Sequence, residues 1–124
     1  MPAALDTSSI MTTRKVLEIR DDNFADLVTA SPVPVLVDFT AVWCPPCKAI
    51  APHVEAIAEA HPDTLRVGKL DTDAHPDLAA RFDIRGLPTL LLFDKGQVVG
   101  QIVGAVPRAR IESLVQSALS RVAA

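Results

Sequence analysis

The feature that most constrains the fold of this chain is the position of its two cysteines, Cys44 and Cys47. The segment just before them, Val33 to Thr40, is almost continuously apolar and rich in β-branched residues, which is typical of a central strand covered on both faces. In the segment after them, which extends to Ala60, apolar residues recur at i, i+4, i+7 and i+8 from Ile50, a spacing that predicts an amphipathic helix. A buried strand therefore leads directly to the two cysteines, and the cysteines open a helix.

The spacing of the cysteines limits what they can do. A permanent disulfide between them would close a very short loop and would constrain the unfolded chain little. A structural zinc site needs four ligands, and the remaining candidates, His53, His61 and His75, form no second pair at a suitable spacing. The pattern leaves a dithiol that opens and closes as its function, or two idle thiols.

The rest of the chain alternates strand and helix patterns. The predicted elements are strands over Val16 to Ile19, Leu65 to Leu70, Thr89 to Phe93 and Gln97 to Val103, and helices over Asn23 to Ala30 with Asp22 as its cap, from Asp73 and Pro76, and from Pro107 onward. The order β-α-β-α-β-α-β-β-α predicts an α/β fold with a mixed five-stranded sheet flanked by four helices, in which the last two strands form an antiparallel hairpin. A ligand site is expected at the carboxyl ends of the parallel strands, where Cys44 lies.

Charge and hydropathy narrow the classes of partner. The net charge of −3 and the lack of a Lys and Arg cluster argue against a nucleic-acid partner. No apolar run reaches the roughly 18 residues that cross a bilayer, so we expect a soluble protein with no membrane partner. A chain of 124 residues has room for one domain, which we place at residues 14–124, and residues 1–13 are interpreted as a flexible leader without the features of a secretory signal. We therefore expect a cytoplasmic protein, in a compartment where such cysteine pairs are catalytic.

Three segments together resemble the thioredoxin family. Val37-Asp38-Phe39, followed by Trp43-Cys44-Pro45-Pro46-Cys47-Lys48, resembles the central strand and active-site helix of the family. Gly86-Leu87-Pro88-Thr89-Leu90 resembles its cis-proline loop, and Val103-Gly104-Ala105 resembles its final substrate-facing turn. The resemblance is to the bacterial type, with WCPPC in place of the usual WCGPC. It implies the thioredoxin fold and a thiol–disulfide oxidoreductase that reduces disulfides in protein substrates.

The expected position of the cysteines at the start of a helix suggests a role for each. Cys44 faces unpaired backbone N–H groups and the positive end of the helix dipole, which favour its thiolate and make it the expected nucleophile. Cys47, one turn further along, should be less exposed and is expected to resolve the mixed disulfide formed at Cys44. The redox-active disulfide would then be sufficient, with no bound metal, nucleotide or flavin in the domain.

Asp38 and Lys69 form a second expected pair. A carboxyl group within the strand sequence VLVDF is expected to be desolvated, which raises its pKa, although an exposed strand end is the alternative. The resemblance implies that Asp38 exchanges a proton with Cys47 and that Lys69 is the partner of this buried acid. A solvated lysine on the strand surface is the alternative for Lys69.

The resemblance also implies a shallow substrate groove. Pro88 is expected to be cis and to lie against Cys44, where the backbone of Leu87 can pair with an extended substrate segment. A place in the core is the alternative for Trp43, but a single Trp beside a polar site more often lies half exposed. The expected apolar rim consists of Trp43, Leu87, Val103, Gly104 and Ala105.

Two positions depart from the usual family pattern. Pro45 lacks the backbone N–H that the usual Gly supplies next to Cys44, and the pair of Pro45 and Pro46 stiffens the dithiol. Both changes favour a stronger reductant, with a potential at or below the value of about −270 mV for thioredoxin. Thr40 occupies a position that is usually aromatic, and its smaller side chain is expected to loosen the packing around Cys44 or to widen the groove.

These observations predict a monomeric protein-disulfide reductase, and the resemblance implies that an NADPH-dependent thioredoxin reductase recharges it. One alternative is a dedicated electron donor to a single target, such as a peroxiredoxin or a methionine sulfoxide reductase. Another is a binding or holdase module in which the dithiol is incidental. An oxidase of the folding type is less favoured, because no export signal precedes the domain and no His lies between the cysteines. The Cys44→Ser variant discriminates, since a binding module would keep its function without the thiol.

Overall fold

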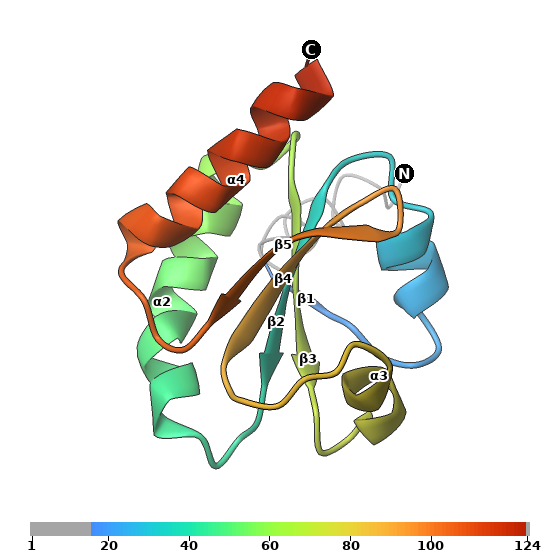
Figure 1. Ribbon diagram of the computed structural model, residues 1–124, viewed down its shortest axis with the longest axis vertical. Helices are drawn as coiled ribbons and strands as arrows, with labels where there is room; N and C mark the ends of the chain where they lie inside the picture. The colour runs from blue at the N-terminus through green and yellow to red at the C-terminus, as the bar shows by residue number, and fades with distance from the viewer. Residues whose placement is uncertain (1–15, 124) are drawn as a thin grey trace, which may run out of the picture.

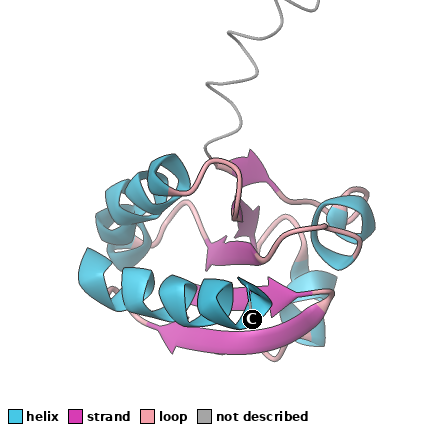
Figure 2. Ribbon diagram, turned by 90° about the horizontal axis from the view of Figure 1, so that it is seen from above, coloured by secondary structure: helices cyan, strands magenta, loops and turns pink. Residues whose placement is uncertain are grey.

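The computed structural model of the chain describes residues 16–123, in which helices cover both faces of a five-stranded sheet (Figure 1, Figure 2). The predicted leader, residues 1–13, lies outside the described residues. The order of strands and helices is the one predicted from the sequence. The elements are β1 (Leu17–Glu18), η1 (Ala25–Thr29), β2 (Val35–Thr40), α2 (Pro45–Ala60), β3 (Arg66–Asp71), α3 (Pro76–Arg81), β4 (Thr89–Asp94), β5 (Gln97–Val103) and α4 (Arg108–Ala123).

Strand β2 lies at the centre of the sheet, whose order is β1-β3-β2-β4-β5. It pairs in parallel with β3 and antiparallel with β4, and β4 and β5 form the antiparallel hairpin. All five residues from Val35 to Phe39 are buried, because helices cover β2 on both sides. The mixed sheet and the doubly covered central strand are thus confirmed.

The core has two layers, one on each face of the sheet. Helices α2 and α4 lie side by side on one face, where they pack with Leu36 of β2 (Figure 1). The other face holds η1 and α3, which pack with Val37 and Phe39. Successive side chains of a strand point to opposite faces of the sheet. Asp38 lies two residues after Leu36 and therefore points to the same face, which α2 covers. The sheet therefore directs this carboxyl group toward the helix that carries the cysteines.

The first helix is shorter than predicted. In place of an α-helix over Asn23 to Ala30, the chain forms a single π-helical segment, and its side chains make no cap hydrogen bond there. The carboxylate of Asp22, the predicted cap, pairs with Nε of Arg20 at 2.9 Å. Oδ1 of Asn23 accepts instead from the backbone N–H of Arg20 at 2.7 Å, and this bond closes the preceding turn. The predicted cap is wrong because the carboxylate of Asp22 pairs with the side chain of Arg20 and does not bond a backbone N–H of the helix.

Helix α3 begins at Pro76, one of the two residues predicted to start it, and not at Asp73. Its N-cap is His75, and Pro76 occupies the first turn, where its missing N–H is no loss. Asp73 lies outside the helix, and its backbone N–H donates to Oδ1 of Asp71 at 2.9 Å. The side chain of Asp73 is therefore available for a contact elsewhere.

Candidate active site

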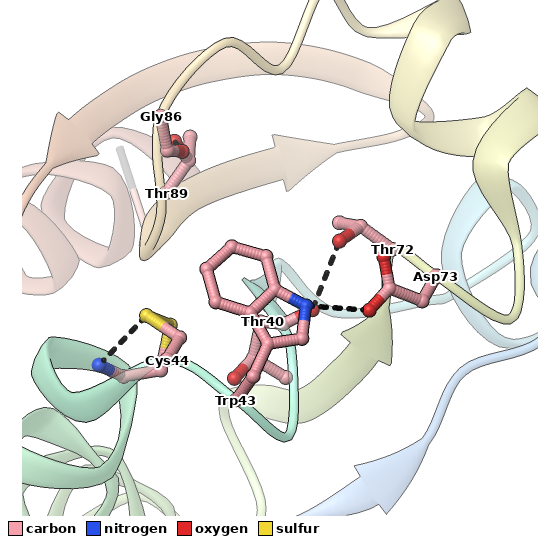
Figure 3. Close-up of a disulfide and its surroundings, with 8 residues drawn as sticks. Thr40, Trp43, Cys44, Thr72, Asp73, Gly86 and Thr89 are labelled. Atoms are coloured by element: carbon pink, nitrogen blue, oxygen red, sulfur yellow. Dashed lines mark hydrogen bonds between the residues drawn. A yellow bond between two sulfur atoms is a disulfide. The ribbon is translucent and has the colours of Figure 1, made fainter.

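The two cysteines form a disulfide at the N-terminus of α2 (Figure 3). Cys44 is the N-cap, in extended conformation, and Pro45 and Pro46 are the first two residues of the helix. The backbone N–H of Cys47 donates to Sγ of Cys44 at 3.2 Å, so the sulfur takes the role that a capping oxygen usually has. The sulfur of Cys44 thus lies where the unpaired N–H groups of the helix converge.

Exposure does not distinguish the two cysteines. Each is 3% exposed, although Cys47 was expected to be the more buried of the two. They pack with Ala41, which follows β2, and with the half-buried Leu87. Pro45 and Pro46, by contrast, are both exposed. What separates the cysteines is their place in the helix, because one caps it and the other lies in its first turn.

The loop before β4 lies beside the disulfide and contains a cis peptide bond between Leu87 and Pro88. Two hydrogen bonds hold this loop. The hydroxyl of Thr89 donates to the carbonyl of Gly86 at 2.6 Å, and the backbone N–H of Gly104 donates to the carbonyl of Pro88 at 2.8 Å. Gly86 and Thr89, which form the first bond, are both drawn in Figure 3. The second bond ties the loop to the residue that follows β5. The predicted contact of Pro88 with Cys44 stays a prediction.

Three large apolar side chains are exposed around this site. Trp43 is 64% exposed and is therefore not part of the core. Val103, at the end of β5, is 56% exposed, and Ala105 just beyond it is also exposed. Val42 is 74% exposed and was missed by the sequence analysis, although its position directly before Trp43 in a loop could have suggested it. Apolar surface of this kind is typical of a binding face for other proteins.

Trp43 has one polar partner that the sequence analysis also missed. Its indole Nε1 donates to Oδ2 of Asp73 at 2.7 Å, across the loops that follow β2 and β3 (Figure 3). Because β2 and β3 are parallel neighbours, the loops at their carboxyl ends meet at the same edge of the sheet. That topology was a signal for the proximity of these loops, but it did not identify the pair.

Asp38 is buried, with 5% of its surface exposed, and its Oδ1 has no hydrogen-bond partner among the described residues. Burial raises the pKa of its carboxyl group to about 7, and the positive charge of Lys69 opposes this rise. Lys69 is the register partner of Asp38 on β3, although its own side chain is exposed. Asp38, Lys69 and Cys47 line one cavity of about 430 Å³, which Thr40 also lines.

Other kinds of site find no support in residues 16–123. This part of the chain contains no group of three or more His, Cys, Asp or Glu side chains that could hold a metal ion. None of its helices is both long and apolar enough to cross a bilayer. The redox-active group that the structure does contain is the disulfide.

Comparison with known proteins identifies relatives across almost this whole region. The family model described as Thioredoxin matches residues 15–117. A protein named Thioredoxin from Acidithiobacillus ferridurans is 45% identical over 104 residues, which is 84% of this chain and 96% of that protein. Thioredoxin from Porphyra purpurea is 41% identical over 105 residues, covering 85% of this chain and 98% of its own length. The chloroplastic M-type protein of Chlamydomonas reinhardtii is 45% identical over 82% of this chain and 73% of that protein.

Proposed function

The chain belongs to the thioredoxin family and is a protein-disulfide reductase, and from this premise we propose the route by which it acts. The thiolate of Cys44 attacks one sulfur of a substrate disulfide, and the other substrate sulfur leaves as a thiolate. The thiolate of Cys47 then attacks Sγ of Cys44 in the mixed disulfide, and the second substrate sulfur leaves. The substrate gains two electrons and the protein ends with the Cys44–Cys47 disulfide, which is the form that the structure holds.

The observation that carries this proposal is the place of the disulfide at the start of α2. As the N-cap, the sulfur of Cys44 accepts the N–H of Cys47 and faces the positive end of a helix of 16 residues. Both interactions favour a thiolate at Cys44 over one at a cysteine in the middle of a helix. Cys47 lies within bonding distance of Cys44 and is therefore the group that can displace a bound substrate.

We assign the proton that Cys47 gives up to Asp38. A carboxyl group with a pKa of about 7 can take and return a proton near neutral pH, whereas an ordinary exposed Asp cannot. Asp38 and Cys47 line the same cavity, so water within it can connect the two groups. Lys69 lines this cavity as well, and its charge keeps the pKa of Asp38 from rising further.

We propose that substrates bind along the exposed apolar surface beside the disulfide. In this proposal the backbone of Leu87, next to the cis Pro88, pairs with an extended substrate segment. Main-chain pairing gives affinity with little dependence on the substrate sequence. The apolar rim that flanks the segment consists of Trp43, Leu87, Val103, Gly104 and Ala105.

The wider setting is also part of the proposal. An NADPH-dependent thioredoxin reductase would return the disulfide to the dithiol, and the chain would work as a cytoplasmic monomer without a bound cofactor, a membrane or a nucleic acid. We place the domain at residues 14–124, a boundary that the family match over residues 15–117 supports. A chain that starts at Arg14 should then unfold at the same temperature as the full chain and keep its turnover.

The experiment that tests the route is insulin reduction with NADPH and thioredoxin reductase. We expect turnover by the natural chain and loss of nearly all of it in Cys44→Ser. Cys47→Ser is the matched variant, and it should accumulate a mixed disulfide between Cys44 and the substrate, which Cys44→Ser cannot form. Accumulation in Cys44→Ser instead would reverse the two roles. Retained biological activity of Cys44→Ser would favour a binding module.

A further inference from the structure

His75 is the residue at which α3 begins, yet its side chain does not cap that helix. The N-cap position favours Ser, Thr, Asp and Asn, whose short side chains accept from the first N–H groups of a helix. The imidazole of His75 makes no such bond to α3, a helix that lies wholly within the described residues. Positions that depart from a local rule of this kind are often functional. The contact that His75 makes instead is therefore informative.

His75 pairs with Asp21, which lies 54 positions earlier in the chain. Nδ1 of the imidazole is 2.9 Å from Oδ2 of Asp21, and the His75 side chain is only 17% exposed. The backbone N–H of Asp21 also points to this nitrogen, at 3.4 Å. Because a carboxylate has no proton to donate, the shorter contact decides the tautomer, and Nδ1–H donates to Asp21. The pair joins the segment after β1 to the start of α3.

A closed turn connects the end of β3 with the start of α3. The backbone N–H of His75 donates to the carbonyl of Asp71 at 3.0 Å, and the backbone N–H of Asp73 donates to Oδ1 of Asp71 at 2.9 Å. Thr72 attaches this turn to the end of β2. Its N–H and its hydroxyl both donate to the carbonyl of Thr40, at 2.9 and 3.2 Å (Figure 3).

The bond between His75 and Asp21 is a second attachment of this turn. A closed turn that is held at one point can pivot about it, whereas a second attachment fixes its direction. Asp73 lies between the two attachments, and its Oδ2 accepts the hydrogen bond of 2.7 Å from the indole of Trp43. The direction of the turn therefore determines where the acceptor for this indole lies.

We propose that His75 is a positioning residue for disulfide reduction. Its bond to Asp21 fixes the turn that carries Asp73, and Asp73 in turn holds the ring of Trp43 in the plane that binds substrate. This inference rests on the place of Trp43 in the proposed apolar rim. A ring that is already fixed loses less conformational freedom when substrate binds, so the effect falls on KM and not on kcat.

The direct test measures the motion of the indole by NMR relaxation in the oxidised full-length protein. Trp43 is the only tryptophan of the chain and gives one indole N–H signal. We expect its order parameter to be about 0.8 in the natural chain and below about 0.6 in Asp21→Ala and in His75→Phe. Asp73→Ala is the reference for a released ring. An order parameter in Asp21→Ala that equals the natural value would overturn the proposal, whatever the thermal stability of the variant.

Asp21→Ala also tests the pair if His75→Phe does not fold, because Asp21 is exposed. Asp21→Asn is the conservative variant, since it keeps an oxygen that accepts from His75 and should restore the natural order parameter. Asp22→Ala is the matched control, because it removes the same charge one position further on, where the partner is Arg20. A loss of order in Asp22→Ala as large as in Asp21→Ala would overturn the proposal in favour of a general charge effect.

Insulin reduction with NADPH and excess thioredoxin reductase provides the second measurement. Asp21→Ala should raise KM about two- to five-fold and leave kcat within about two-fold of the natural value. A released ring with an unchanged KM would overturn the proposal. Asp21→Ala added to Asp73→Ala should cause no further loss, and a further loss would show that the pair does not act through Asp73. Failure of the natural chain to reduce insulin would contradict the proposed function instead, and the NMR comparison would still decide whether His75 holds the ring.

Discussion

The indole Nε1 of Trp43 donates a hydrogen bond of 2.7 Å to Oδ2 of Asp73, a residue that lies 30 positions further along the chain. The bond joins the loop that leads to the cysteines with the loop that leads to α3. Both partners are exposed, so this bond contributes no more than about 1 kcal/mol to folding. The bond instead orients the indole of Trp43, because it fixes the plane of this ring, the largest exposed apolar side chain next to the disulfide.

We expect Trp43→Phe and Asp73→Ala each to lower kcat/KM for insulin reduction about two- to ten-fold, mainly through KM, because a freely rotating ring binds substrate less well. Asp73→Asn keeps an acceptor oxygen at this position and should retain most of the activity. The double variant should be no worse than the more impaired single variant. Additive losses in that double-mutant cycle would show that the two residues act independently.

The stability of the oxidised protein should depend on pH through Asp38. Between about pH 4 and pH 7 the folded chain keeps this proton while the unfolded chain has lost it, so the free energy of unfolding falls as pH rises. Above the folded pKa of about 7 the penalty levels off at roughly 4 kcal/mol.

Asp38→Asn removes this penalty. Urea denaturation should show little difference from the natural chain near pH 4 and a stabilisation of up to about 4 kcal/mol near pH 9. A stabilisation that is the same at both pH values would mean that the effect comes from packing and not from ionisation.

The redox potential should respond to Pro45. We expect the natural chain to have a potential at or below about −270 mV, and Pro45→Gly to raise it by about 30 mV, the equivalent of one modest hydrogen bond. The physical reason is that Gly adds an N–H next to the sulfur of Cys44 and frees the reduced chain, and both effects stabilise the dithiol.

Equilibration with glutathione measures both potentials. A natural chain whose potential approaches the value of about −120 mV known for strong periplasmic oxidants would contradict the first expectation. A lower potential in Pro45→Gly would contradict the second.

Gly68 is required by close packing between strands β1 and β3. A Cβ added at this position would lie 2.5 Å from Cγ1 of Ile19, a fully buried side chain, and 3.2 Å from the carbonyl of Leu17. Gly68→Ala should therefore lower the free energy of unfolding by about 1 to 3 kcal/mol in urea denaturation. Gly86→Ala is the control, since its Cβ would meet Val103 at an ordinary 3.5 Å and should change stability by less than about 1 kcal/mol.

Much of the fold was predictable because strong local patterns agree with one another. The continuous apolar segment around Leu36 requires two covering layers, and the short connection before Gln97 permits only an antiparallel hairpin. The helix after Cys44 follows from its apolar period. These signals are local, and each was sufficient to identify its element.

What the sequence did not reveal depends on contacts between distant segments. The partnership of Trp43 and Asp73 arises only once two parallel strands are paired, and the exposure of Val42 follows from the direction of the same loop. The cap predicted at Asp22 is wrong because the carboxylate of Asp22 pairs with the side chain of Arg20, and Asn23 accepts from the backbone N–H of Arg20. The cavity at Asp38 is lined by side chains from several elements that are distant in the sequence, so its existence depends on how these side chains pack together.

The pairing of Phe39 with Thr89 has a consequence for the choice of targets. Phe39 precedes the segment that carries the disulfide, and Thr89 follows the cis-proline loop. The width of the groove that we propose between these two segments is therefore set by hydrogen bonds of the central sheet and not by a hinge. The proposed groove cannot widen unless the buried strands β2 and β4 separate from each other. Any change of shape that binding requires must then come from the target protein. We expect disulfides in segments that unfold locally to be reduced, while those in rigid domains are spared.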